Sequence, residues 1–223
     1  MRLTTNTNFQ QHANINISME KLNPTSTQFK LHDWLTQHIS EHANIHMSDD
    51  SHLHETLAQL APHSVVQIVN TFRQSNPLFP CQKASSGEGR GSGFIIDGYI
   101  FTNYHVVKAA RNLHALFPST GSEKFILKVI AAFPEGDLAI CKFVNKPSFE
   151  IQNLTLGNSD QALSGTPVVA VGYPLGRTGQ CLTGGMVSSH QQLGTREVLQ
   201  TDAAINPGNS GGGLFHAKTL EIL

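Results

Sequence analysis

The sequence predicts an all-β sandwich or barrel that follows a short α-helical N-terminal segment. From Val65 onward, short runs rich in β-branched and aromatic residues recur at intervals of roughly 10–15 residues, which is typical of many short strands. Gly, Pro, Asn and Ser separate these runs, as expected for turns. Two of the runs flank Asp97-Gly98, a dipeptide that favours a tight hairpin. Together these observations favour many short strands over alternating strands and helices.

The composition indicates a globular chain with a substantial core. Of the 223 residues, 39% are hydrophobic, and with 19 glycines the fraction reaches about 48%, within the usual globular range of roughly 45–50%. Lys and Arg number 15 against 16 Asp and Glu, and this formal charge of −1 argues against a nucleic-acid binder. No run of about 18 apolar residues occurs, so we expect no membrane-spanning helix. The length allows one large domain or two small ones.

The residues 1–62 are predicted to form an N-terminal extension. Its first 26 residues are rich in Asn, Thr and Gln and are expected to form a polar tail. Apolar residues at helical spacing predict one helix over 28–47 and a second over 51–60. Pro62 is expected to end the second helix, because proline cannot continue a helix interior. No apolar segment typical of a secretory signal follows Met1, which predicts a cytoplasmic location.

The strand-forming part of the chain begins at residue 64. The predicted strands cover residues 64–69, 93–96, 99–102, 125–132, 138–143, 167–172, 182–189 and 197–201. Segment 144–164 has few strand signals and suits a crossover between two halves. The sequence therefore predicts two groups of strands joined by one long connection.

The segment Asn206–Gly212 is the first candidate for chemistry. A serine flanked by glycines in a loop after a strand, as Ser210 is here, is sterically open. Gly208 can adopt a conformation that points its N–H, together with that of Ser210, at one spot. Two such amides are what the oxyanion of acyl transfer needs. The same residue types also form ordinary tight turns, so both interpretations stay open on this loop alone.

A serine nucleophile needs a base and a group that orients the base. The chain has 12 histidines, so the presence of one proves little. His105 follows the Asp97-Gly98 hairpin directly and is therefore placed at a strand end. Asp137 precedes an apolar strand, where a partly buried carboxylate needs a partner. Singly these could be a buried histidine and a turn acid, but the order His, Asp, Ser at strand edges favours a catalytic triad.

Three segments resemble those of one protease family. Gly91–Val107 is similar to the histidine segment of the HtrA/Deg serine proteases, Asp137–Ile140 to their aspartate segment, and Thr201–Gly212 to their serine segment almost residue for residue. The resemblance extends from about Val65 to Phe215. It implies a trypsin-like fold of two six-stranded β-barrels, with the active site in the cleft between them.

The resemblance also implies domain boundaries. The protease domain would cover 63–223, with barrel one at about 63–144 and barrel two at about 165–223. Family members continue beyond the position of Leu223 with a further strand and a helix. We therefore expect an incomplete second barrel, and a protease domain with no PDZ domain after it.

The resemblance assigns a role to each site residue. Ser210 would be the nucleophile, His105 the general base and then acid, and Asp137 the group that orients His105. The amides of Gly208 and Ser210, with Asn209, would form the oxyanion hole. Ala204, followed by Ile205, stands where the trypsin branch has an acid that selects Lys or Arg. A small or medium apolar P1 residue is therefore implied.

Asn209 differs from the aspartate that digestive proteases have before the serine. A neutral amide cannot form an ion pair with a freed N-terminus, so zymogen cleavage is not the expected route of activation. The family's alternative, ordering of loops when substrate or a partner binds, is our hypothesis.

The expected activity is that of a serine endopeptidase that cleaves unfolded or damaged protein, in protein quality control, with no metal or organic cofactor. The expected partners are unfolded polypeptides and further copies of the chain, because homotrimers are common in this family. No nucleic acid is expected. The alternative is a catalytically weak pseudoprotease that acts as a binding or scaffold protein.

Three further signals point elsewhere. The glycine-rich segment 87–93 leads into a strand and has no phosphate-binding lysine, so a mobile entry to the first barrel is expected instead of a nucleotide site. Histidines spaced four apart could bind Zn²⁺ or Ni²⁺, although a solvated polar face is the stronger interpretation. Three cysteines far apart predict isolated thiols. The histidines concerned are His38, His42 and His46, with His52 and His54 nearby.

Overall fold

The computed structural model of the protein describes residues 50–74, 85–121, 123–194 and 196–223. The predicted tail, the helix over 28–47 and the histidine spacing on it lie outside the described residues. The second predicted helix is α3 (Asp50–Ser64). The prediction that Pro62 ends this helix is wrong, because α3 includes Pro62 in its last turn. Only two helical residues follow Pro62, and the Ser64 hydroxyl donates to the Leu60 carbonyl at this end of the helix (2.9 Å).

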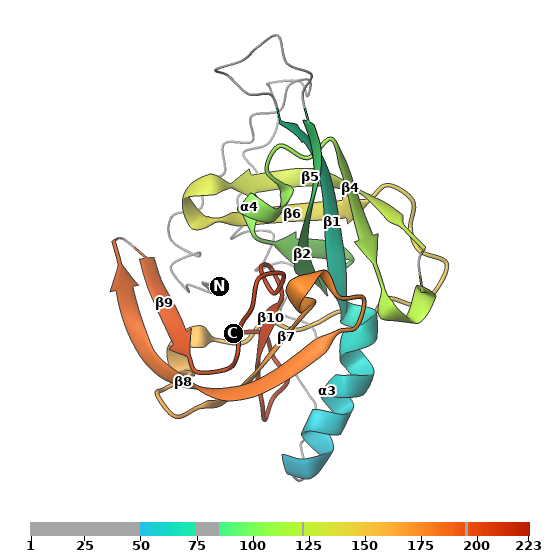
Figure 1. Ribbon diagram of the computed structural model, residues 1–223. Helices are drawn as coiled ribbons and strands as arrows, with labels where there is room; N and C mark the ends of the chain where they lie inside the picture. The colour runs from blue at the N-terminus through green and yellow to red at the C-terminus, as the bar shows by residue number, and fades with distance from the viewer. Residues whose placement is uncertain (1–49, 75–84, 122, 195) are drawn as a thin grey trace, which may run out of the picture.

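Six strands form a closed barrel in the first half of the fold (Figure 1). All neighbouring pairs are antiparallel, in the order β1-β2-β3-β6-β5-β4 around the barrel. The strands are β1 (Val65–Gln74), β2 (Ser85–Ile96), β3 (Tyr99–Thr102), β4 (Asn112–Leu116), β5 (Phe125–Phe133) and β6 (Leu138–Phe143).

The predicted hairpin connects β2 to β3. Asp97 and Gly98 both have positive φ, 49° and 76°, which a two-residue turn matched to the strand twist requires. The expected mobile entry over 87–93 is wrong, because this segment is the middle of β2 and pairs along its length with β1. At Gly91 a side chain would collide with Val106, whose γ carbons lie 2.7 Å from the Cβ position. Glycine therefore permits close packing within a regular strand here.

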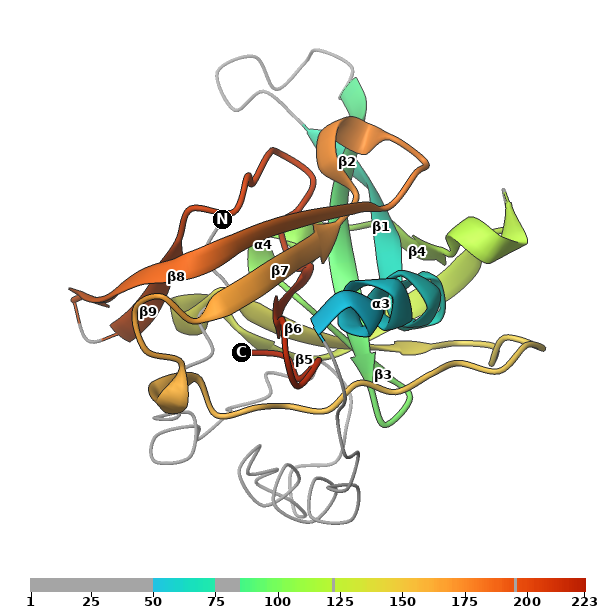
Figure 2. The same ribbon diagram turned by 90° about the horizontal axis from the view of Figure 1, so that it is seen from below.

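The second half is an open antiparallel sheet in the order β10-β7-β8-β9. Its strands are β7 (Pro167–Gly172), β8 (Cys181–Leu193), β9 (Arg196–Thr201) and β10 (Gly213–His216). Residues 221–223 extend it beside β10, with the Leu223 amide donating to the Leu214 carbonyl (2.8 Å). The β8–β9 hairpin projects to one side of the molecule (Figure 2). The predicted two-part β fold is confirmed, with a half-barrel as its second part.

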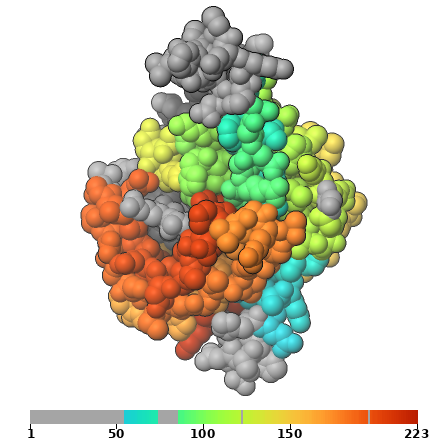
Figure 3. Space-filling view, viewed as in Figure 1, coloured from blue at the N-terminus to red at the C-terminus, as the bar shows by residue number. Residues whose placement is uncertain are grey.

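A shared apolar core joins the two halves. Phe94 and Phe101 of the first barrel belong to the same buried cluster as Val171, Tyr173 and Phe215 of the second half. The Tyr173 hydroxyl also donates to the backbone carbonyl of Val65, which begins β1 (3.1 Å). In the space-filling view the red chain after β9 lies at the seam between the green first barrel and the orange second sheet (Figure 3). The positions of loops at this seam therefore depend on contacts with both halves.

No helix among the described residues is long and apolar enough to cross a membrane.

Candidate active site

His105 lies on a single turn of helix at the end of β3. This turn is α4 (Tyr104–Val107), where the sequence pattern predicts only the end of a strand. Its first amide, that of Tyr104, donates to the Asp137 carbonyl (3.1 Å). At its other end the buried Asn70 side chain donates to the Val106 carbonyl (2.9 Å). Both ends of the turn are therefore attached to other parts of the first barrel, which fixes the backbone that carries His105.

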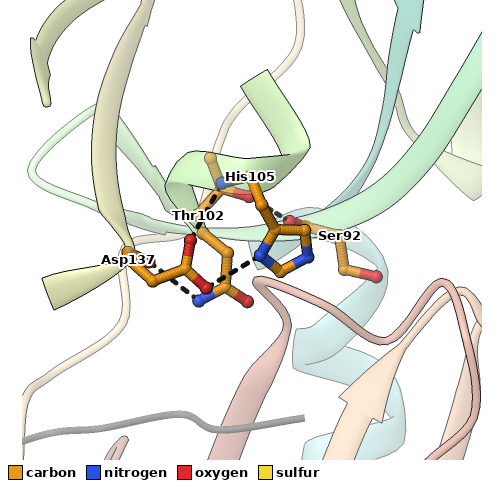
Figure 4. Close-up of polar contacts among 5 residues, drawn as sticks. Ser92, Thr102, His105 and Asp137 are labelled. Carbon is orange, nitrogen blue, oxygen red and sulfur yellow. Dashed lines mark hydrogen bonds and ion pairs between the residues drawn. The ribbon is translucent and has the colours of Figure 1, made fainter. Parts of the chain in front are cut away.

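Asp137 contacts His105 twice. Its backbone is left-handed (φ 53°, ψ 42°), a conformation that Asp tolerates better than most residues. One carboxylate oxygen accepts the His105 backbone N–H (2.9 Å), and the other lies 2.7 Å from the ring Nδ1. In Figure 4 the carboxylate faces the imidazole ring. A carboxylate can only accept, so Nδ1 bears a proton, and in the neutral ring Nε2 has the free lone pair.

Both side chains of this pair are accessible from outside. The His105 side chain is 54% exposed and that of Asp137 is 36% exposed. The basic Nε2 atom of a ring so oriented can take a proton from a neighbouring hydroxyl. The pair therefore has the chemistry of a general base with its orienting carboxylate.

The Ser210 loop lies against β2 and the end of β3, the strand that precedes His105. The Ser210 carbonyl accepts the Ser92 amide (2.7 Å), and the Thr102 hydroxyl donates to the Ser92 carbonyl (2.7 Å). Gly211, with φ of 82°, lets the loop approach so closely that a side chain would collide with both Thr102 and Ser92. Among the described residues no hydrogen bond joins the Ser210 hydroxyl to His105. Such bonds are often long in unliganded enzymes.

The directions of the Gly208 and Ser210 N–H groups follow from the bonds that the carbonyls of the same two peptides accept. The Pro207 carbonyl accepts the Leu175 amide (2.6 Å), and the Asn209 carbonyl accepts the Gly212 amide (2.8 Å). In a trans peptide the N–H points opposite to the C=O, so the N–H groups of Gly208 and Ser210 point away from these partners. Within the described ranges no hydrogen bond uses either N–H.

The Asn209 amide differs from the other two. It donates to the Asn206 carbonyl (3.0 Å), so it is not a free donor in this turn. Its side chain is buried, and the side-chain oxygen has no hydrogen-bond partner among the described residues. Of the three predicted oxyanion donors, only the amides of Gly208 and Ser210 make no hydrogen bond among the described residues, and their role as oxyanion donors stays a prediction.

Ala204 and Ile205, predicted to line the substrate pocket, lie before the loop. Ala204 is exposed, and its carbonyl accepts the Thr183 hydroxyl of β8 (2.9 Å). Ile205 is partly buried and packs against the core of the second sheet. No acidic residue stands at either position, so the predicted preference for an apolar P1 residue stays a prediction.

Sequence reasoning missed two residues of the site. Ser92 stands between two glycines, and the glycine-rich run obscured it as a strand residue. Leu175, whose amide orients the Pro207 peptide, has no sequence signal, because only its backbone is used. Among the described residues no three His, Cys, Asp or Glu side chains are grouped so that they could bind a metal ion.

The fold and the site together define a class of protein. A closed six-stranded barrel and a second antiparallel sheet, with His105, Asp137 and Ser210 at their junction, are the arrangement of trypsin-like peptidases. A family model described as "Trypsin-like peptidase domain" matches residues 91–221, which is more than half of the chain.

Curated proteins similar to the chain belong to one branch of this class. A "Probable periplasmic serine endoprotease DegP-like" of Chlamydia muridarum is 40% identical over 134 residues, 57% of this chain and 26% of that protein. "Protease Do-like 1, chloroplastic" of Arabidopsis thaliana is 33% identical over 164 residues, 70% of this chain and 36% of that protein. The chain thus spans about a quarter to a third of the length of these relatives.

A solved structure supports the same branch. The structure "HtrA-type protease AlgW with tripeptide" is 30% identical, with a TM-score of 0.62 over 79% of this chain and 53% of that one. The protein described here belongs to the HtrA/Deg family of trypsin-like serine proteases.

Proposed function

We propose that the protein is a serine endopeptidase that acts through a Ser210–His105–Asp137 triad and an acyl-enzyme. The observation that carries the proposal is the double contact of the Asp137 carboxylate with His105, at the ring and at the backbone. This contact leaves Nε2 as the basic atom. The Ser210 carbonyl is meanwhile bonded to Ser92, whose own carbonyl accepts the hydroxyl of Thr102 at the end of the strand that leads to His105, which supports a nucleophile beside that base.

The reaction follows from these groups. His105 Nε2 takes the proton of the Ser210 hydroxyl as the oxygen attacks the scissile carbonyl, and a C–O bond forms. The resulting oxyanion accepts the N–H groups of Gly208 and Ser210. The imidazolium, stabilised by Asp137, then gives its proton to the leaving amine as the C–N bond breaks. Water repeats the sequence on the ester and releases the acid.

The proposed substrates are unfolded or damaged polypeptides with a small or medium apolar P1 residue. Ala204 and Ile205 support this preference, because neither provides a charge to bind Lys or Arg. The relatives are named serine endoproteases, which supports cleavage within chains. Hydrolysis of peptide esters with Val, Ala or Leu at P1, compared with Lys or Arg, measures the preference.

Fluorophosphonate labelling of the 223-residue chain tests the proposal. The probe is expected to modify Ser210, as located by mass spectrometry, and the labelling is expected to disappear in Ser210→Ala and His105→Ala. Ser188→Ala and His114→Ala change an exposed serine and a histidine of β4 and are expected to label like the unaltered chain. No labelling of a folded sample would contradict the proposal and favour a binding protein.

A further inference from the structure

Ser92 of β2 is fully buried, and each of its polar groups is hydrogen-bonded. Its backbone amide donates to the Ser210 carbonyl (2.7 Å), and its carbonyl accepts the Thr102 hydroxyl (2.7 Å). Its hydroxyl donates to the Gly208 carbonyl (2.7 Å) and accepts the Tyr173 amide (2.9 Å). One residue of the first barrel thus bonds three residues of the second half, and two of them belong to the nucleophile loop.

One of these contacts helps to orient the Gly208 amide of that loop. The Gly208 carbonyl is bonded to the Ser92 hydroxyl, and the preceding Pro207 carbonyl is bonded to the Leu175 amide (2.6 Å). Both peptide planes next to the Gly208 Cα are therefore fixed, and with them the direction of the Gly208 N–H. Leu175 lies two residues after Tyr173, whose amide the same Ser92 hydroxyl accepts.

The surroundings of Ser92 require a hydroxyl at this position. A hydroxyl can donate to one group and accept from another at once, as this one does. The packing is close, since a Cβ on Gly172 would lie 2.9 Å from the Ser92 oxygen. Removing the hydroxyl would leave the partly buried Gly208 carbonyl and the buried Tyr173 amide without this partner, which favours rotation of the peptide at Gly208.

We propose that Ser92 is a positioning residue for the oxyanion hole, which holds the Gly208 N–H toward the scissile carbonyl. The inference rests on the proposed function, because it concerns the same site. Ser92 does not touch the substrate. It acts through the Gly208 peptide, across the seam between the barrel and the second sheet.

Kinetics of Ser92→Ala test the proposal in the 223-residue chain. Loss of one oxyanion donor costs roughly 100–1000-fold in kcat, so its misplacement is expected to cost about 10–100-fold, with KM for a peptide ester changed by less than about threefold. Ser64→Ala is the matched control, since Ser64 is also fully buried and its hydroxyl donates to one carbonyl, that of Leu60 in α3, which is not part of the loop. Its kcat is expected to stay within about twofold of the unaltered value.

A second readout does not depend on activity. Pro207-Gly208 is the only Pro-Gly pair among the 223 residues, so ¹³C-carbonyl proline with ¹⁵N-glycine gives a single correlated amide signal, that of Gly208. Ser92→Ala is expected to shift or split this signal, and Ser64→Ala to leave it in place. If Ser92→Ala does not fold, Ser92→Cys, with a weaker donor of similar shape, replaces it in both measurements.

The outcomes separate this inference from the proposed function. If the unaltered chain is not labelled by fluorophosphonate, the proposed function fails, and the Gly208 signal alone decides whether Ser92 orients the loop. If labelling succeeds but the Ser92 variant retains both its kcat and the Gly208 signal, the inference is overturned and the endopeptidase stands. A lower melting temperature with unchanged kcat and Gly208 signal assigns Ser92 a purely structural role and also overturns it.

Discussion

Asp137→Asn isolates the orientation of His105 from its packing. The His105 backbone N–H is always a donor, so the substituted amide must keep its oxygen toward it, at the site where the carboxylate now accepts over 2.9 Å. The amide nitrogen then faces Nδ1, where the second oxygen now lies at 2.7 Å. Two donors cannot face each other. The imidazole therefore moves its proton to Nε2 and loses the base that faces Ser210.

The expected loss follows from this change of tautomer. An Asp-to-Asn change in a catalytic triad lowers kcat by about 10⁴, which corresponds to about 5.4 kcal/mol at 1.36 kcal/mol per tenfold. Stability is expected to fall by only about 1 kcal/mol, because the bond to the His105 backbone survives. The assay is hydrolysis of an activated peptide ester near pH 7, with urea unfolding of the same preparation.

Asp97→Asn provides a matched control. Asp97 also has a left-handed backbone, with φ of 49° against 53° at Asp137, but it lies in the β2–β3 hairpin turn. Its kcat is expected to stay within about twofold of that of the unaltered chain. An Asp137→Asn variant that keeps more than a tenth of the kcat would refute the tautomer argument.

Three further results are expected. Gly208→Ala places a side chain against the Tyr173 carbonyl, at a residue with φ of 102°. We expect kcat to fall by about 100-fold or more while the circular dichroism spectrum keeps its β signal. A variant that stays active would exclude the proposed oxyanion hole. Burial lowers the pKa of His216 below its usual 6.5, aided by Lys218 and opposed by Glu221. Below pH 6.5 the unfolded chain therefore gains a proton that the folded chain resists, and stability falls as the pH drops through 6.5 toward the folded pKa. The His216→Asn variant is expected to lose less stability than the unaltered chain between about pH 7.5 and about pH 5.5, as measured by the midpoints of urea unfolding. An equal loss in the two proteins would contradict this expectation. Burial raises the pKa of the Cys141 thiol to about 12. A disulfide reagent at about pH 8 is therefore expected to modify Cys141 only when the chain unfolds. Rapid labelling of Cys141 in the native chain, detected by peptide mapping, would count against this expectation.

Local pattern predicted most of the strands because their signals lie within a few residues. The run at 167–172 became β7 with the same bounds, and Asp97-Gly98 became the β2–β3 turn. The strand β4 was missed, because it has only five residues and none of them is a β-branched or aromatic residue, the types that mark the other strands. The turn that carries His105 was missed as well. Its two valines favour strands, and its shape is decided by bonds to two residues far along the chain, the carbonyl of Asp137 and the side-chain amide of Asn70.

The sequence by itself determined the class of this protein, since three short motifs name its candidate nucleophile, base and carboxylate, and its strand runs predict the β architecture. Only the tertiary structure decided which amides of the nucleophile loop are free and what orients them. The Ser92 hydroxyl donates to the Gly208 carbonyl, which lies 116 positions further along the chain. Periodicity and turn residues report on near neighbours, whereas a contact at this separation exists only after the barrel and the second sheet have packed together.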